Sequence, residues 1–185
     1  MINCTNSILF APINKYRKIP EKLIYSRSFI FAGKLFEHCK VFSTKTGKFG
    51  GFMEMRPEAI TLNNFRKPSV YVSYLYSNVS GHGFGTSLLN YARSFSKEVG
   101  CEGRIFLDAD SSLNPYYAPH IFYRKYGMNT GKREIDKKLD KFIKKRKNAT
   151  NKDFSIERMF YPPIAYSKEK NIFKRLFTKM RDIFC

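Results

Sequence analysis

A glycine-rich segment between a strand-like run and a helix-like run most constrains how this chain can fold. Residues 80–86 read Ser-Gly-His-Gly-Phe-Gly-Thr, after the β-branched and aromatic run 70–76 and before apolar residues at helical spacing over 85–99. Glycines let the backbone turn tightly and keep its N–H groups accessible. At a helix N-terminus, unpaired N–H donors and the helix dipole favour an anion. The segment therefore predicts a loop that binds phosphate or pyrophosphate.

The spacing of these glycines excludes two common phosphate-binding loops. A Walker loop closes on Gly-Lys-Ser/Thr, and the segment has no lysine. A dinucleotide fingerprint needs another glycine three residues after Gly85, where the chain has Leu88. The segment instead resembles motif A of the GNAT superfamily of acyl-CoA N-acyltransferases, Gln/Arg-x-x-Gly-x-Gly/Ala. Gly83 and Gly85 match the two motif glycines, and Ser80 stands where the family usually has Gln or Arg.

A second run resembles motif B of the same family. Residues 122–128 read Phe-Tyr-Arg-Lys-Tyr-Gly-Met, against Phe-Tyr-x-Lys-x-Gly-Phe in the family. They follow the apolar run 104–109, which is typical of a buried strand. Gly127 fits the left-handed position that ends a helix. Strand, glycine loop, helix, strand and helix occur in the family's order, and the resemblance covers about residues 40–130.

The resemblance implies an α/β (α+β) fold of the GNAT type, with a mixed, mostly antiparallel central sheet flanked by helices. We expect one acyltransferase domain over residues 1–167, with its core at about 28–130, and a basic amphipathic helix over 168–185. Residue patterns predict the remaining elements, which are a helix around 19–25, a strand at 28–32, a hairpin joining 40–44 to 49–55, a connection between Pro57 and Pro68, a helix within 133–147 and a strand within 154–161.

The charge of the chain indicates an anionic partner. The chain has 185 residues and a formal net charge of +19. Residues 1–70 contain twelve basic and four acidic residues, and residues 129–185 contain seventeen basic and seven acidic residues. The middle segment, residues 71–128, is nearly neutral, with five basic and four acidic residues. Such a field raises the encounter rate with polyanions. The partner could be a nucleic acid, an anionic membrane or an acidic protein. A general compositional bias towards Lys, Asn, Ile, Phe and Tyr would also account for the charge.

Cysteine and histidine usage predicts neither a metal nor a disulfide framework. The four cysteines and three histidines are scattered singly, without ligand or redox spacing. No run has the length of a membrane span, and the N-terminus lacks a basic region followed by an apolar stretch. We therefore expect reduced thiols and a cytoplasmic protein, peripheral to a membrane if its tail binds lipid.

The C-terminal segment alternates bulky apolar residues with cations. Its composition suits a helix at a membrane surface, a helix that docks on a partner or a helix that packs on the domain's own sheet. These three alternatives stay open at this point. The apolar stripe consists of Ile172, Phe173, Leu176, Phe177, Met180, Ile183 and Phe184.

The resemblance implies transfer of an acetyl group from acetyl-CoA to an amine. The amine must be neutral to attack, and the leaving thiolate needs an acid. Tyr123 holds the position of the motif B tyrosine, commonly the acid in this family, with Tyr126 and Tyr117 as neighbouring alternatives. Between Glu58 and Glu98 the chain has no carboxylate, so the strand before the loop supplies no base. The candidate bases are Glu54 and Asp108, with Asp110, His82, His120 or a water relay as alternatives.

The resemblance also implies contacts with coenzyme A. The strand 70–76 would separate from its neighbour, so that backbone groups near Leu75, Tyr76 and Ser77 pair with the pantetheine arm. Asn114 is a further candidate, although it lies nine residues before Tyr123 where the family usually has seven. The loop residues expected to contact the cofactor are Gly81, His82, Gly83, Phe84, Gly85 and Thr86.

Two functions from different classes follow. The first is an N-acetyltransferase whose acceptor is the amine of a protein lysine, a protein N-terminus or an aminoacylated tRNA. A polyamine is disfavoured as acceptor, because a chain of charge +19 repels polycations. The second is a catalytically inactive GNAT-like module that binds nucleic acid or an anionic membrane.

Overall fold

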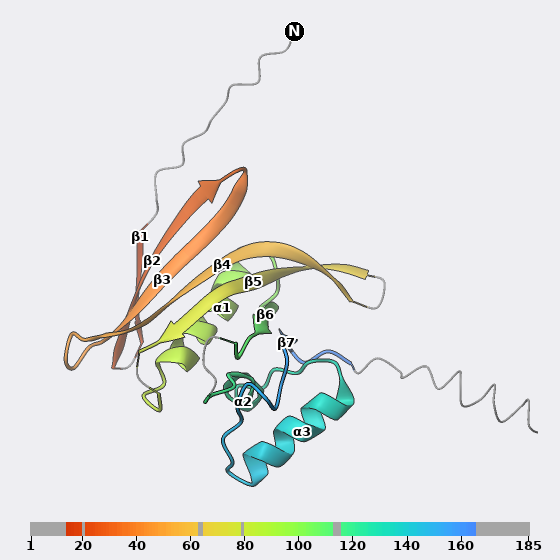
Figure 1. Cartoon of the computed structure of the whole chain (residues 1–185). Coiled ribbons are helices and arrows are strands. Elements are labelled where there is room, and N and C mark those ends of the chain that lie inside the picture. The colour runs from red at the N-terminus through yellow and green to blue at the C-terminus, as the bar shows by residue number, and fades with distance from the viewer. Residues whose placement is uncertain (1–13, 20, 63–64, 79, 113–115, 166–185) are drawn as a thin grey trace, which may run out of the picture.

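The computed structural model describes residues 14–19, 21–62, 65–78, 80–112 and 116–165 (Figure 1). In this part of the chain seven strands form one sheet in sequential order, and only the β5–β6 pair is parallel. This mixed, mostly antiparallel sheet with flanking helices confirms the predicted fold class. The predicted helix over 168–185 lies outside the described residues. The elements are β1 (Asn14–Ile19), β2 (Lys22–Phe31), β3 (Lys34–Ser43), β4 (Phe49–Leu62), β5 (Phe65–Ser77), α1 (Phe84–Glu98), β6 (Ile105–Ala109), α2 (His120–Lys125), α3 (Arg133–Lys144) and β7 (Glu157–Tyr161).

The helix predicted around 19–25 is wrong, because Ile19 is the last residue of β1 and residues from Lys22 onward form β2. Ile24 and Ser26 are buried while Arg27 is exposed, so burial alternates along the segment with the period of a strand. β2 pairs with β1 on one side and with β3 on the other. The strand predicted at 28–32 is the far end of the same element.

The connection predicted between Pro57 and Pro68 is also wrong. Both prolines lie inside the long hairpin of β4 and β5, where Pro57 is opposite Val70 and Pro68 is opposite Ala59. The register of β3 with β4 ends at Met55, and that of β5 with β6 begins at Val70. Each proline therefore sits where its strand has a registered partner on one side only, which is where a strand tolerates a residue without an N–H.

The predicted hairpin of 40–44 and 49–55 is confirmed as β3 and β4, and the helix within 133–147 as α3. β7 corresponds to the strand within 154–161 and pairs antiparallel with β6. Between α2 and α3, a single bridge joins Asn129 to Phe160 at the other edge of β7. Helix α3 follows this bridge, so it is inserted before the last strand.

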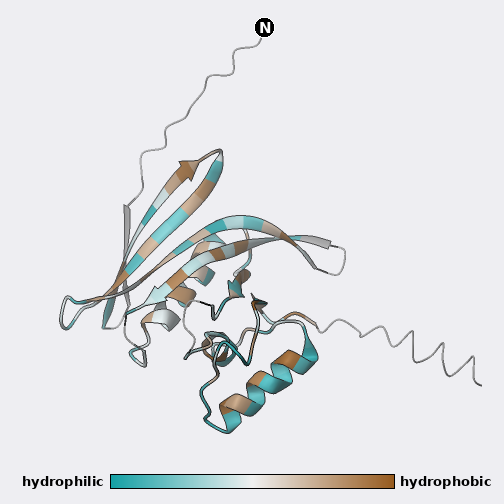
Figure 2. Cartoon of the chain, in the orientation of Figure 1, coloured by the Kyte–Doolittle hydropathy of each residue, from teal (hydrophilic) through white to brown (hydrophobic). Residues whose placement is uncertain are grey.

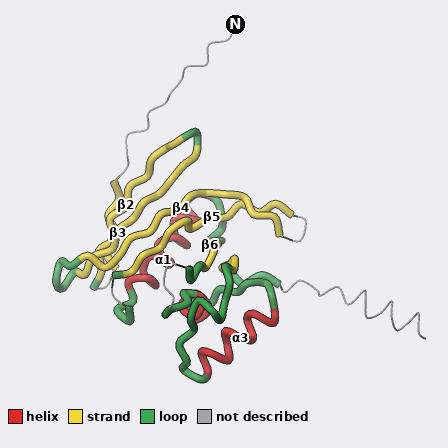
Figure 3. Tube along the Cα trace, viewed as in Figure 1, coloured by secondary structure: helices red, strands yellow, loops and turns green. Residues whose placement is uncertain are grey.

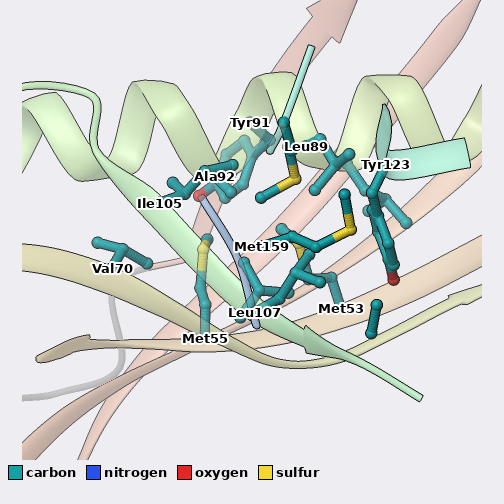
Figure 4. Packing of buried hydrophobic residues seen from close by; sticks show 14 of the residues in the cluster. Met53, Met55, Val70, Leu89, Tyr91, Ala92, Ile105, Leu107, Tyr123 and Met159 are labelled. Carbon is teal, nitrogen blue, oxygen red and sulfur yellow. The ribbon is translucent and has the colours of Figure 1, made fainter. Parts of the chain in front are cut away.

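Helix α1 covers the inner face of the sheet and forms the main core with it. Figure 3 shows the helices gathered on one side of the strands, and Figure 2 shows the apolar residues of α3 grouped on part of its surface. Figure 4 shows Leu89 and Ala92 of α1 over Met53, Leu107 and Met159 of the sheet. All five side chains are 2% exposed or less. Burial of this apolar surface is the main stabilising contribution to the fold.

One carboxylate lies inside this layer, and hydroxyl groups satisfy it. Glu37 of β3 is 1% exposed and accepts hydrogen bonds from the hydroxyls of Ser28 and Tyr91. The Tyr91 hydroxyl also lies 2.6 Å from Ser26 Oγ. Burial, together with the bond to Glu37, raises the pKa of Tyr91, so its hydroxyl stays protonated as a donor. This cluster links α1 to β2 and β3.

The substitution Tyr91→Phe should lower the free energy of unfolding by about 1–3 kcal/mol, because it leaves a buried carboxylate with one donor fewer. Urea denaturation measures the change. Tyr74→Phe serves as the control, since Tyr74 is 44% exposed on the opposite face of the sheet, and it should change stability by less than about 0.5 kcal/mol. Equal effects of the two substitutions would contradict a role of the hydroxyl in the core.

Candidate functional site

The glycine loop places the start of α1 with its backbone donors uncapped. Gly81 and Gly83 have φ of +80° and +71°, the left-handed region that glycine adopts without strain. Gly83 is the N-cap residue, so no side chain caps the helix, and the first turn contains no acidic residue. The first N–H groups of a helix have no partner within it. The start of α1 therefore offers donors and a positive dipole end to an anion.

Lys22, the first residue of β2, brings a cation to this loop. A Cβ atom built on Gly83 would lie 2.9 Å from Lys22 Nζ. The ammonium also stands 5.7 Å from the centroid of the Phe84 ring, the first residue of α1. Lys22 could not be recognised from the sequence, because nothing in the local pattern of β2 indicates that its start meets a loop some 60 residues later. Its charge lies beside the glycine loop, which contains no cation of its own.

A cavity of about 650 Å³ opens between the loop and the turn that joins β3 to β4. Three of its lining residues are lysines, and Lys45 forms an ion pair with Glu21 at 2.6 Å. The cavity therefore has a net positive lining beside the uncapped helix start. The lining residues are Glu21, Lys22, Ser43, Lys45, Thr46, Lys48, Phe49, Asn78, Gly81, His82 and Phe84.

The three loop glycines differ in what surrounds them. A Cβ on Gly81 would meet nothing within 4 Å, whereas one on Gly85 would lie 2.9 Å from the ring of Phe122. The missing side chain of Gly85 thus allows the Phe122 ring of α2 to pack directly on α1. The open backbone of the loop is at Gly81, next to the cavity.

The parallel strands β5 and β6 diverge immediately after they meet. They pair only at Val70 with Ile105 and at Tyr71 with Phe106. Further along, β5 pairs with β4 alone among the described strands, and a bulge at Ser73 shifts that register. A bulge increases the local twist of a strand. Over residues 72–76, which include the predicted cofactor contacts Leu75 and Tyr76, the β6 side of β5 is therefore not covered by a strand.

Tyr123 lies on α2 among the core residues near this divergence. It is 8% exposed, and Figure 4 shows its hydroxyl end directed away from α1 and towards the strands. Burial raises the pKa of Tyr123, and nearby Tyr117 adds to the increase. Tyr123 therefore keeps its proton at neutral pH, as an acid must. Of its two rivals, Tyr126 donates a hydrogen bond to Asn90 at 2.8 Å, and Tyr117 is 46% exposed.

The two predicted carboxylate bases lie on the other face of the sheet from Tyr123. The side chain of Asp108 points to the opposite face of the sheet from its buried neighbours Leu107 and Ala109. Glu54 is exposed between two buried methionines. Arg158 holds Asp108 through bonds of 2.7 and 3.0 Å and keeps the pKa of that carboxyl below its usual range. The structure thus does not bring Glu54 or Asp108 together with Tyr123.

The other candidates have different surroundings. Asp110 accepts bonds from the backbone and hydroxyl of Ser112. His120 is fully buried, with Nε2 2.9 Å from the Ser155 carbonyl, and burial lowers its pKa, so it is neutral. His82 borders the cavity. Asn114 lies outside the described residues.

The described residues include no group of three or more His, Cys, Asp or Glu side chains placed to hold a metal ion. Their two cysteines, Cys39 and Cys101, are both buried as free thiols. Among the helices described, none combines the length and the apolar character needed to cross a bilayer.

No protein-family model and no curated protein matches the chain. Solved structures do resemble it. They include an aminoglycoside acetyltransferase from an uncultured soil metagenomic sample in complex with trehalose (TM-score 0.37, 22% identity, 49% of this chain and 56% of the other). Arabidopsis thaliana NAA60 in complex with a bisubstrate analogue gives a TM-score of 0.39 at 12% identity, over 51% and 62% of the two chains.

A third structure, the toxin AtaT bound to the C-terminus of the antitoxin AtaR and to acetyl-CoA, gives a TM-score of 0.37 at 20% identity, over 50% and 59% of the two chains. The chain therefore spans little more than half the length of these structures. The chain's own order of strand, uncapped glycine loop, helix, parallel strand and helix is the order that the sequence resemblance predicts.

Proposed function

We propose that this chain is an acyl-CoA-dependent N-acyltransferase that transfers an acetyl group from acetyl-CoA to an amine. The observation that carries the proposal is the divergence of β5 and β6 directly before an uncapped, lysine-flanked helix start. A strand edge without a strand partner can hydrogen-bond an extended amide chain. An uncapped helix start can hold a diphosphate. Coenzyme A contains both groups in one molecule.

The residues around the loop fit this cofactor. Backbone N–H groups near Gly81 to Thr86 would hold the diphosphate, and Lys22 would add the charge that Ser80 lacks. Lys45 and Lys48, further along the cavity, would face the remaining phosphate. Residues 72–76 of β5 would bind the pantetheine arm. When bound, acetyl-CoA supplies the thioester as acyl donor.

The chain's own groups would then handle two protons. Tyr123 keeps its proton because burial raises its pKa, and it would deliver that proton to the leaving sulfur. Because Glu54 and Asp108 lie on the opposite face, we infer that a water molecule takes the proton of the acceptor amine. The acceptor we propose is a protein or RNA-linked amine, since the charge of +19 favours anionic macromolecules.

Acetyl-CoA should raise the melting temperature of the protein, because a ligand at one hundred times its Kd adds about 2.7 kcal/mol to the stability of the native state. Lys22→Ala should weaken binding roughly tenfold or more, as expected for loss of a charge-assisted contact. Thermal shift and calorimetry measure both effects. Lys40→Ala is the matched control, since Lys40 is an exposed lysine on β3 away from the cavity. No shift at millimolar acetyl-CoA would remove the proposal.

One alternative is a catalytically inactive GNAT-like module that binds nucleic acid or an anionic membrane. It is favoured because Glu54 and Asp108 lie on the face opposite Tyr123 and because Asp108 is paired with Arg158. It would bind RNA, DNA or anionic vesicles with steep salt dependence. Assays of thiol release from acetyl-CoA with pooled amine acceptors separate the two functions. Release that depends on the acceptor supports the enzyme, and binding without release supports the module.

A further inference from the structure

A row of five aromatic side chains and one arginine, here called the aromatic row, crosses the outer face of the sheet, opposite the helices. The row begins on β2 and ends on β7, with one residue from each strand, and neighbouring members touch. Phe29 stacks on Phe36 at 5.5 Å, and Tyr71 lies 5.0 Å from Phe106. The Arg56 guanidinium lies between them, 5.9 Å from the Phe36 ring and 4.9 Å from the Tyr71 ring. The aromatic row is Phe29, Phe36, Arg56, Tyr71, Phe106 and Phe160.

The β2 end of this face is exposed, whereas Phe106 and Phe160 at the other end of the aromatic row are only 4% and 9% exposed. Phe29 is 41% and Phe31 is 68% exposed at the β2 end of the aromatic row. A neighbouring cluster, in which Phe52 stacks on Tyr74 and contacts Tyr76, leaves both tyrosines at least 40% exposed. Contiguous apolar surface of this kind marks a contact site in a folded protein.

The described chain ends on this face, at the other end of the aromatic row. Ile164 packs against Ile60, Phe106 and Phe160. The buried side chain of Asn129 fixes Ile164 in place, since its Nδ2 donates to the Ile164 carbonyl at 2.7 Å and its Oδ1 accepts from the Ile164 N–H at 2.9 Å. A hollow of about 350 Å³ lies here, and its lining includes the same apolar residues, Ala165 and the two cations Lys67 and Arg104. Twenty residues follow Ala165.

The sequence of those residues matches the surface in length and in character. Residues 168–185 predict an amphipathic helix, and 18 residues of helix are about 27 Å long. The aromatic row crosses six strands, which is about 24 Å at the usual strand spacing. The tail has six basic and two acidic residues. The exposed carboxylate of Glu54 flanks the aromatic row, whereas Glu58 is already paired with Arg56 at 3.1 Å.

We propose that residues 168–185 dock as a helix on the outer face, along the aromatic row from its β6 end to the exposed Phe29. The apolar stripe of Ile172 to Phe184 contacts the exposed rings, and a cation of the tail faces Glu54. Because the anchored Ile164 holds the tail next to its site, the docking is intramolecular and gains from a high effective concentration. The docked helix forms a third layer over the sheet and is independent of the proposed enzyme activity.

A spin label on Cys185 of the full-length chain tests the docking. Cys39 and Cys101 are buried, so Cys4→Ser leaves Cys185 as the reactive thiol. We expect paramagnetic broadening of backbone amide signals near Phe29 and Phe36, at the far end of the aromatic row, with no added lipid or RNA. Phe173→Asp with Leu176→Asp should abolish it. The matched control Asn171→Asp with Thr178→Asp puts the same charges on the polar side of the predicted helix and should preserve it.

Several results would overturn the proposal. They are absence of broadening near the β2 end, equal broadening in both double variants, and broadening that requires anionic vesicles, which would assign the tail to a membrane instead. Binding of 8-anilinonaphthalene-1-sulfonate gives a second readout on the same variants. It should rise several-fold when Phe173 and Leu176 are replaced, because the exposed rings become accessible, and should not rise in the control.

Discussion

Replacing Gly51 with alanine should lower the free energy of unfolding by about 3 kcal/mol or more. Gly51 has φ of +155°, which side-chain-bearing residues rarely adopt. A Cβ atom there would lie 2.2 Å from the carbonyl oxygen of Tyr76 and 3.1 Å from Cα of Ser77. Both are backbone atoms of β5 and cannot rotate away. Strands β4 and β5 would therefore have to separate at the end that leads into the glycine loop. Urea denaturation measures the change.

Gly47→Ala is the matched control for this substitution. Gly47 also has a left-handed φ of +65°, but a Cβ there would meet nothing within 4 Å. This replacement should cost only about 1–2 kcal/mol, the penalty of the left-handed conformation itself. The difference between the two variants isolates the backbone clash. Equal losses would show that the approach of β4 to β5 at Gly51 is not what requires glycine.

Local patterns predicted the part of the fold from β5 to α2, because each element there has its own periodicity. The run 70–76, the loop at Gly81 to Gly85 and the helical spacing of Leu88 and Leu89 need no distant partner to be recognised. The N-terminal hairpins were harder. Ile24 and Ser26 alternate with exposed residues over too short a stretch to separate a strand from a helix, and Pro57 reads as a break. Pro57 fits in β4 because the strand pairs at this point with β5 only, so the missing N–H can lie on the unpaired side.

The residues of the candidate site also fall into two groups, those that a local motif predicts and those that depend on how distant segments pack. Loop glycines and Tyr123 stand in recognisable motifs, whereas Lys22 reaches the loop only because β2 starts where α1 starts. The contact of Gly85 with Phe122 likewise depends on how α2 packs on α1. The positions of Glu54 and Asp108 could have been derived from strand periodicity, since each sits between inward-pointing neighbours and must point outward.

Tyr123→Phe should lower kcat for acetyl transfer by about 10²–10⁴, the range typical of a general acid, with little change in KM for acetyl-CoA. The substitution removes one oxygen and leaves the packed ring, so the fold should persist. Tyr117→Phe is the control at a neighbouring, more exposed phenol and should keep kcat within a few-fold. Stopped-time assays of thiol release at saturating acetyl-CoA measure both variants.

The kcat of Tyr123→Phe across the pH range distinguishes an acid from a merely packed ring. Burial raises the pKa of Tyr123 above its ordinary value of about 10. The Tyr123 hydroxyl is therefore protonated at every pH below that value. Deprotonation of Tyr123 should not lower the wild-type kcat between neutral pH and about pH 10. In the phenylalanine variant kcat should be reduced by the same factor throughout this range. If water supplies the proton instead, kcat of Tyr123→Phe stays near that of the wild type, and the role of Tyr123 is confined to packing against Leu89 and Met53.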